Sequence, residues 1–190
     1  MISNKKFLTV SEITFIAVLS TALGVSWWGW TFLNDVAQIA LKPIGFNHLL
    51  EGFWLIGSVF FAYIIRKPGS AILGEVVAAF IQGMIAKWGI SSLAYGFVQA
   101  IPVEILFLCF AYNRWDWKIL SVAGMLSALA SFVLTYFWYG YESLNPLFNV
   151  FQLAIFLLSG AFFCGFIAKK IADLLKKAGV LYQFKISQDE

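Results

Sequence analysis

The stretch from Ile64 to Glu104, IIRKPGSAILGEVVAAFIQGMIAKWGISSLAYGFVQAIPVE, decides how this chain folds. It sets two carboxylates, Glu75 and Glu104, inside two adjacent hydrophobic segments. An acidic side chain at the centre of a membrane helix costs about 2.5–3.5 kcal/mol on insertion scales. A membrane protein that keeps such groups usually binds or moves something with them, so the stretch predicts a ligand site if both segments cross a bilayer.

The composition of the whole chain is that of a membrane protein. Of its 190 residues, 61% are hydrophobic and only 12% are charged, whereas soluble domains have about 25% charged residues. The length accommodates about six helices of about 20 residues. We therefore predict one all-α membrane domain, residues 1–190, with six transmembrane helices. The approximate spans are 11–30, 48–65, 70–88, 95–112, 119–139 and 147–172, and residues 31–47 form the longest connection.

The basic residues predict the orientation of the chain. With six spans, one side of the membrane collects eleven of the 13 Lys and Arg residues, and only Lys42 and Lys87 fall on the other side. Cytoplasmic loops carry the excess of Lys and Arg, so both termini are expected in the cytoplasm. The basic side consists of Lys5, Lys6, Arg66, Lys67, Arg114, Lys118, Lys169, Lys170, Lys176, Lys177 and Lys185.

Polar residues in the third and fourth segments indicate where a ligand would bind. Glu75 and Gln82 are seven residues apart and share a helix face, so the third segment is expected to be central. With a rise of about 1.5 Å per residue, Glu104 lies roughly 12 Å below the outer end of the fourth segment. It is too deep to be solvated and has no basic neighbour in its own helix. Glu104 is therefore the strongest site candidate, whereas Glu75 could instead pair with Arg66.

Aromatic and amide side chains gather at the expected outer ends of the segments. Together they predict an outward-facing, aromatic-lined cavity above the buried acids, suited to a planar cationic or amine-bearing ligand. Glu51 is close enough to the interface to be solvated, and His48 is expected to cap a segment end. The candidate ligand-binding residues are Glu104, Gln99, Gln82, Glu75, Trp54, Trp88, Tyr139 and Asn149.

Small residues in the first segment predict a helix-packing face. Ala17, Ser20, Thr21 and Gly24 recur at spacings of three and four, which places them on one side of a helix. Such faces let another helix backbone approach closely. The partner helix belongs either to this chain or to another subunit.

The sequence lacks the motifs of several classes of enzyme and metal-binding protein. The sequence has no GxxxxGK[ST] for binding ATP, no G-x-S-x-G and no histidine cluster, and Cys109 and Cys164 lack CxxC spacing. We expect no cofactor, no metal and no enzymatic activity. Two alternatives to a binding protein stay open: an intramembrane enzyme that uses Glu75 and Glu104 as acid and base, and an assembly subunit without a ligand.

Four motifs carry a resemblance to a known family. They are EGFWLIG at 51–57, AYIIRKPGSAILGEVVAA at 62–79, Gly96 and Gln99 followed by Glu104, and LSGAFFCGFIAKKIAD at 158–173. The chain resembles the YkoE family, the substrate-capture (S) components of energy-coupling factor (ECF) transporters for thiamine and its hydroxymethylpyrimidine (HMP) precursor. The resemblance implies a six-helix S-component fold in a prokaryotic plasma membrane. It also implies a complex with a transmembrane coupling (T) subunit and two ATP-binding cassette subunits, which would hydrolyse the ATP.

The resemblance further implies roles for the candidate residues. Glu104 and Gln99 would hold the aminopyrimidine edge, Gln82 or Glu75 would assist, and an aromatic ring would stack on the ligand. The small face of the first helix looks like the surface that docks on the coupling subunit. The chain departs from the family pattern at Gln82, where an acid is common, at Ala86 and Lys87, where Gly-Asn is common, and at Pro102, where Gly is common. These departures favour a pyrimidine without the thiazolium cation, or another small vitamin or nucleobase-like ligand.

Overall fold

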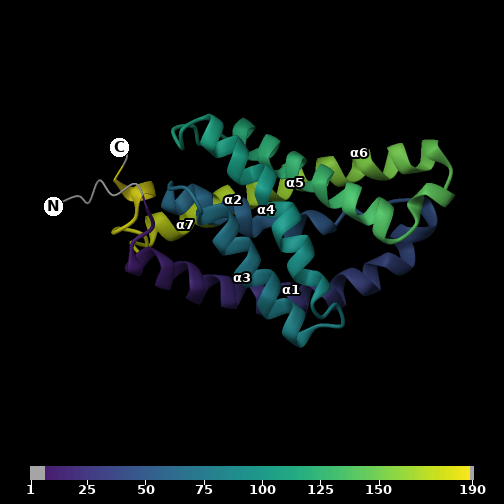
Figure 1. Cartoon of the computed structure of the whole chain (residues 1–190), viewed down its shortest axis with the longest axis horizontal. Helices are drawn as coiled ribbons and strands as arrows, with labels where there is room; N and C mark the ends of the chain where they lie inside the picture. The colour runs from purple at the N-terminus through teal and green to yellow at the C-terminus, as the bar shows by residue number, and fades with distance from the viewer. Residues whose placement is uncertain (1–6, 189–190) are drawn as a thin grey trace.

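The computed structural model describes residues 7–188, and this part of the chain folds into helices and connections without a strand (Figure 1). The outcome agrees with the predicted all-α class. The α-helices are α1 (Val10–Leu41), α2 (Ile56–Ile65), α3 (Ser70–Ile85), α4 (Ser91–Cys109), α5 (Trp117–Trp138), α6 (Pro146–Phe162) and α7 (Lys169–Lys177). Short helices are η1 (Lys42–Ile44), η2 (Glu51–Leu55), η3 (Tyr141–Ser143), the π-helical η4 (Phe163–Ala168) and η5 (Lys185–Ser187).

Four of the helical stretches are long and apolar enough to cross a membrane by length and composition. They are Val10–Ile44, Ser91–Cys109, Trp117–Trp138 and the continuous run Pro146–Lys177. Two further apolar stretches, Glu51–Ile65 and Ser70–Ile85, are shorter. All six predicted segments therefore contain a helix, but the second and third are too short to match the others.

The first helix is longer than the sequence suggested. The prediction that residues 31–47 form a connection is wrong in its first part, because α1 continues to Leu41. Thr31 and Asn34 are buried on the same side as Trp27, so these polar residues face the bundle and do not mark a loop. The helical path ends only at Pro43 in η1 and at Gly45, whose φ of 80° suits glycine.

The second segment begins as a turn and becomes the most enclosed helix. Residues 51–55 form the 3₁₀-helix η2, and α2 follows from Ile56. All ten residues of α2 are buried. The third helix, α3, packs against α1, α2 and α4, as its polar stripe predicted, but α2 occupies the centre.

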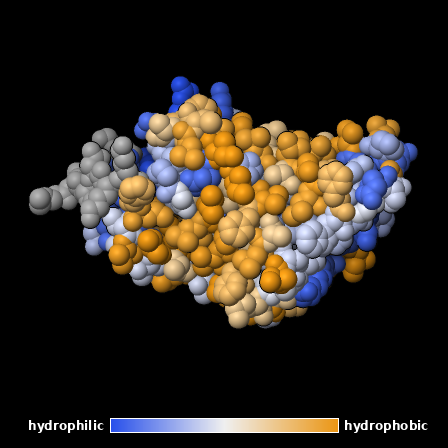
Figure 2. Space-filling view, viewed as in Figure 1, coloured by the Kyte–Doolittle hydropathy of each residue, from blue (hydrophilic) through white to orange (hydrophobic). Residues whose placement is uncertain are grey.

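The bundle presents apolar side chains over its middle and collects polar ones toward its ends. Figure 2 shows hydrophobic residues across the centre of the face in view and hydrophilic residues near both ends. The beginning of α1 and the last part of the described chain lie at the same end (Figure 1), where the rings of Phe15 and Phe184 are 4.1 Å apart. Lys5 and Lys6, which contributed to the predicted orientation, lie outside the described residues.

Glycines allow α5 and α6 to pack closely. A Cβ atom on Gly124 would lie 2.2 Å from the carbonyl oxygen of Gly160, and one on Gly160 would lie 2.5 Å from the oxygen of Gly124. Both obstacles are backbone atoms, so neither can move aside without shifting a helix. Residues without a side chain are therefore required where these two helices meet.

We expect Gly124→Ala to destabilise the bundle by about 1–3 kcal/mol, the usual cost of overpacking a close-packed interior. Gly29→Ala is the matched control, since a Cβ there meets nothing within 4 Å. Thermal unfolding of the two purified variants in detergent measures the difference. Equal unfolding midpoints would show that the helices can separate without cost.

Candidate functional site

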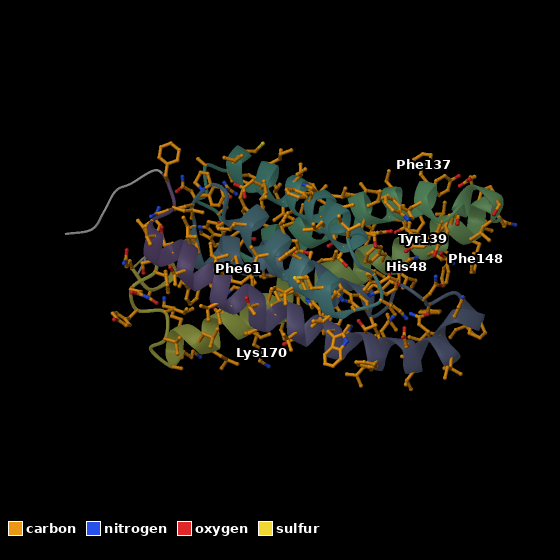
Figure 3. All side chains as sticks on the ribbon, turned by 60° about the horizontal axis from the view of Figure 1, so that its bottom comes forward. His48, Phe61, Phe137, Tyr139, Phe148 and Lys170 are labelled. Atoms are coloured by element: carbon orange, nitrogen blue, oxygen red, sulfur yellow. The ribbon has the colours of Figure 1, made fainter. Side chains whose placement is uncertain are left out.

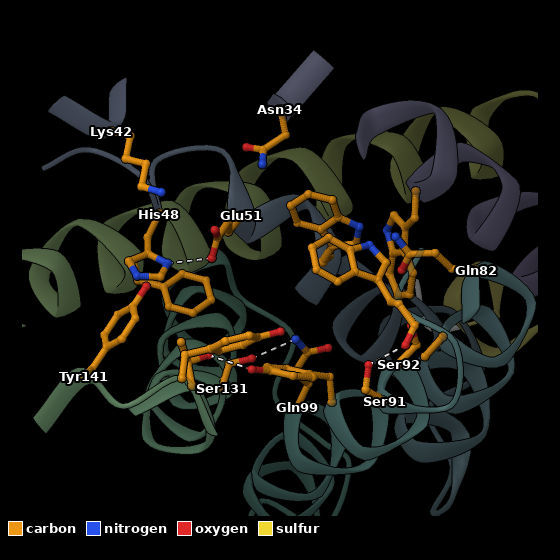
Figure 4. Close-up of a pocket in the computed structure, with 18 residues that line it drawn as sticks. Asn34, Lys42, His48, Glu51, Gln82, Ser91, Ser92, Gln99, Ser131 and Tyr141 are labelled. Carbon is orange, nitrogen blue, oxygen red and sulfur yellow. Dashed lines mark hydrogen bonds and ion pairs between the residues drawn. The ribbon is translucent and has the colours of Figure 1, made fainter. Parts of the chain in front are cut away.

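A partly open cavity of about 450 Å³ lies at the end of the bundle away from the start of α1. Its volume is within the range of small-molecule sites, about 300–1,000 Å³. Side chains converge on it from α1, η2, α3, α4 and α5 and from the connections at the same end of the bundle (Figure 4). The residues used below are Asn34, Lys42, His48, Glu51, Trp54, Gln82, Trp88, Tyr95, Gln99, Ser131, Tyr139 and Tyr141.

One end of the cavity carries the charged side chains. The His48 Nδ1 atom lies 2.5 Å from Oε2 of Glu51, and the His48 ring stacks on Phe156 with centroids 5.0 Å apart. Figure 4 shows Lys42 and Tyr141 beside this pair. The carboxylate of Glu51 keeps one oxygen that bonds no other described residue, so it can accept a hydrogen bond from a ligand.

His48 lies in the connection before η2, outside the described helices. Burial lowers the pKa of its imidazole, but the charge and hydrogen bond of Glu51, with a hydrogen bond to Gln152, outweigh burial and raise this pKa above its usual 6.5. The two side chains therefore form a hydrogen-bonded pair in the cavity wall.

The other end of the cavity is lined by amides and indoles. The Gln99 Nε2 atom donates to Oγ of Ser131 over 2.8 Å, which leaves the Gln99 carbonyl oxygen for a ligand. The Nε2 atom of Gln82 and the Nε1 atom of Trp54 are buried and have no partner among the described residues. A buried donor without an acceptor costs about 1–3 kcal/mol, so a ligand that supplies acceptors would regain that free energy.

The structure brings five of the eight predicted ligand-binding residues to one place. Gln82, Gln99, Trp54, Trp88 and Tyr139 all line the cavity. They come from η2, α3, α4 and two connections, which are distant in sequence. Glu104, Glu75 and Asn149 do not line it.

Glu104, the strongest candidate from the sequence, belongs to the opposite end of the bundle. The helix α4 begins at Ser91, so Glu104 lies about 20 Å along it, deeper than the sequence estimate. Its Oε1 atom accepts hydrogen bonds from the backbone N–H of Gly69, over 2.6 Å, and from the Tyr112 hydroxyl, over 2.5 Å. Glu104 therefore links the α2–α3 turn to the end of α4 and does not reach the cavity.

Glu75 and Asn149 also have structural partners. Oε2 of Glu75, which is fully buried, accepts a hydrogen bond from the backbone N–H of Ser58 over 2.6 Å. Ser58 is in the first turn of α2, where N–H groups lack helical partners, so Glu75 caps α2 from a neighbouring helix. The Asn149 Nδ2 atom donates to the carbonyl oxygen of Tyr141 and thereby fixes a residue of the cavity wall. No bond between Glu75 and Arg66 is seen.

The sequence analysis did not include His48 and Glu51 among the candidate ligand-binding residues. It assigned Glu51 to solvent and His48 to a segment end, but His48 is 2% exposed and Glu51 lines the cavity. The signal for their pairing was their spacing of three residues. The burial of His48 had no local signal, because its ring packs against Phe132 of α5, Tyr141 of η3 and Phe156 of α6.

The predicted docking face of α1 is divided between two surroundings. Ser20 and Gly24 are buried, and a Cβ on Gly24 would lie 2.6 Å from the carbonyl oxygen of Ala78 in α3. Ala17 and Thr21 are exposed. Half of the small face thus serves packing within the chain, and only the other half is accessible to another subunit.

We expect Glu104→Ala to destabilise the fold, because the buried Tyr112 hydroxyl loses its acceptor at about 1–3 kcal/mol and the half-buried Gly69 N–H loses its own as well. Tyr112→Phe removes the hydroxyl donor together with its hydrogen bond to Glu104, so no donor is left unpaired, and the expected cost is smaller, about 1 kcal/mol. Thermal unfolding in detergent gives the order of the two effects. A Glu104→Ala variant as stable as the wild type would contradict the structural role.

The comparisons with known proteins all match transporter components, but the cargoes in their names differ. The model of a family described as "ABC-type cobalt transport system, permease component" matches residues 11–130. The "Putative HMP/thiamine permease protein YkoE" of Bacillus subtilis (strain 168) is 34% identical over 173 residues, which cover 90% of this chain and 86% of that protein. A crystal structure of an S-component of an ECF transporter superposes with a TM-score of 0.90 at 32% identity, covering 96% of this chain and 93% of the other.

Proposed function

Because the chain belongs to the YkoE family of ECF-transporter S components, we propose that it captures thiamine or HMP in the cavity described above. The ligand enters from outside a prokaryotic plasma membrane. The protein binds it without catalysing a reaction and hands it to an ATP-driven complex. The name of the Bacillus relative supports this ligand class.

The observation that carries the proposal is the match between the cavity wall and an aminopyrimidine. Such a ring offers nitrogen acceptors, an amine donor and two flat faces. The partnerless donors of Gln82 and Trp54 suit the ring nitrogens, and the oxygens of Glu51 and Gln99 suit the amine. Trp88 and Tyr139 provide aromatic faces for stacking.

Charge in the cavity favours the neutral member of this ligand class. Lys42 and His48 lie at the same end as Glu51 (Figure 4), so the single carboxylate is accompanied by at least one positive charge. A thiazolium cation at this end would meet that charge, whereas a hydroxymethyl group would not. We therefore favour HMP over thiamine as the tighter ligand.

The cobalt in the name of the matching family suggests a metal ion as a second candidate cargo. Within residues 7–188, no three His, Cys, Asp or Glu side chains are grouped as metal ligands. The cavity offers His48 and Glu51 together with amides, indoles and hydroxyls. This set suits an organic ring better than a transition metal, which prefers several imidazole or thiolate ligands.

The proposal includes two kinds of partner, a coupling subunit that packs against α1 and ATP-binding cassette subunits on the cytoplasmic side. We place the coupling subunit on the exposed half of the α1 small face, at Ala17 and Thr21, where a helix can approach closely. Two ATP-binding cassette subunits would hydrolyse ATP on the cytoplasmic side, the side on which the basic residues place both termini.

Mass spectrometry of small molecules released from the purified chain tests the function directly. We expect recovery of HMP or thiamine after expression in cells supplied with both. Recovery of a flavin, biotin or cobalamin would overturn the ligand assignment. A chain that carries no ligand and binds none on titration would favour the assembly subunit, and turnover of a bound molecule would favour the intramembrane enzyme.

We expect Glu51→Gln to weaken HMP binding by about 10- to 100-fold, since hydrogen bonds to charged groups contribute about 1.5–3 kcal/mol. Titration calorimetry measures the dissociation constants for HMP and thiamine. Glu142→Gln is the matched control, because Glu142 is exposed in η3 at the same end and does not line the cavity. Unchanged affinity in a folded Glu51→Gln variant would remove Glu51 from the site.

A further inference from the structure

A second hollow includes Lys170, which lies away from His48 and Tyr139 in the bundle (Figure 3). This groove of about 310 Å³ runs between the start of α5 and the helix formed by η4 and α7. We call it the α5–α7 groove; its lining residues are Trp117, Gly165, Phe166, Lys169, Lys170, Asp173, Leu174 and Lys177. It contains three lysines, an indole and apolar side chains, although charged side chains on a helix normally face the solvent and not a groove with apolar walls.

The length of the last helix places this groove at the level of lipid headgroups. The run from Pro146 to Lys177 has 32 residues and is about 48 Å long, whereas the hydrocarbon core is about 30 Å thick. If Pro146 starts at one boundary, about 20 residues cross the core and Gly165 to Lys177 emerge at the other boundary. Trp117, 61% exposed at the first position of α5, is typical of that boundary.

The charges in the groove do not cancel. The Lys169 Nζ atom lies 2.6 Å from Oδ2 of Asp173, and the Tyr63 hydroxyl donates to Oδ1 over 2.8 Å. This acid is therefore already satisfied, and Lys170 and Lys177 supply excess positive charge. They are seven residues apart, so they share one face of the helix.

The apolar part of the groove continues on the same face. Phe166 and Leu174 are each 55% exposed and lie four residues on either side of Lys170. The Lys170 ammonium sits 5.6 Å from the centre of the Phe166 ring. Positive charge thus borders apolar side chains on one face of the helix. A negatively charged amphiphile can contact both parts of this face, whereas a purely apolar or a purely ionic ligand can contact only one of them.

We propose that the α5–α7 groove binds one anionic phospholipid molecule. The headgroup phosphate lies between Lys170 and Lys177 beside Trp117, and an acyl chain lies along Phe166. Basic pockets between membrane helices on the cytoplasmic side bind such headgroups. The inference does not depend on the vitamin that the cavity binds.

Native mass spectrometry of the full chain tests the proposal. The protein in detergent is titrated with phosphatidylglycerol or with phosphatidylcholine, and one phosphatidylglycerol is expected to stay bound while phosphatidylcholine is lost. The double variant Lys170→Gln/Lys177→Gln should bind phosphatidylglycerol about 30-fold more weakly, since each basic residue near a membrane contributes about fivefold. Its HMP affinity should equal that of the wild type.

The matched control is Arg114→Gln/Lys185→Gln, which removes the same charge from exposed positions outside the groove. Equal weakening in both double variants would overturn the site in favour of diffuse charge attraction. Equal retention of phosphatidylcholine would also overturn it. Displacement of the lipid by millimolar glycerophosphoglycerol, which has no acyl chains, would show that a free phosphodiester suffices and would refute the lipid assignment. Thermal unfolding of both variants confirms that they are folded.

Discussion

A polar group inside this bundle costs free energy unless the protein supplies a partner, because the surrounding hydrocarbon offers none. Two carboxylates in membrane-spanning helices illustrate the constraint. Glu75 accepts from the N–H of Ser58 at the start of α2, and Glu104 accepts from the N–H of Gly69 at the α2–α3 turn. The two acids therefore satisfy backbone groups at the beginnings of α2, the most buried helix, and of α3. Their cost in lipid is offset by the cost of leaving those N–H groups unpaired.

The same constraint separates the structural polar groups from the ligand site. Glu75 and Glu104 each use one oxygen to accept from donors within the protein, and their second oxygens are buried without a partner among the described residues. The N–H groups of Trp54 and Gln82 are also buried without an acceptor, but these two donors border the cavity. An unmade hydrogen bond therefore indicates the candidate site only where the group also borders the cavity, and the depth of an acid in the membrane is a poorer guide. An acid that is deep and paired stabilises the fold; a shallower acid such as Glu51, which faces a cavity, is available to a ligand.

The sequence was sufficient for the fold class, the six hydrophobic segments and five of the cavity residues. Gln82, Gln99 and Trp54 were predicted correctly to line the cavity because polar and aromatic side chains gather at the same ends of their segments. Glu104 was misplaced because its depth depended on where α4 begins, and periodicity does not define a helix start to within a turn. The pairing of His48 with Glu51 was missed because His48 is buried by rings that are distant in sequence, Phe132 and Phe156, and such burial leaves no local signal. The split of the α1 small face had the same origin: spacing identifies a packing face but not the partner that covers it.

Unequal helix lengths explain why the cavity lies where it does. α2 has ten residues and α3 has sixteen, which are about 15 and 24 Å long, whereas the 32 residues of α1 extend about 48 Å. At the end of the bundle where α1 begins, Glu104 ties the α2–α3 turn to α4, and Lys67 of the same turn pairs with Glu12 of α1 at 2.7 Å. With these ends fixed together, the shortfall of α2 and α3 appears at the other end of the bundle, where the cavity lies. Longer helices and η2 surround that gap, and their side chains become the cavity wall. The two acids that the sequence assigned to the ligand thus contribute indirectly, since they hold the short helices at the depth that leaves room for it.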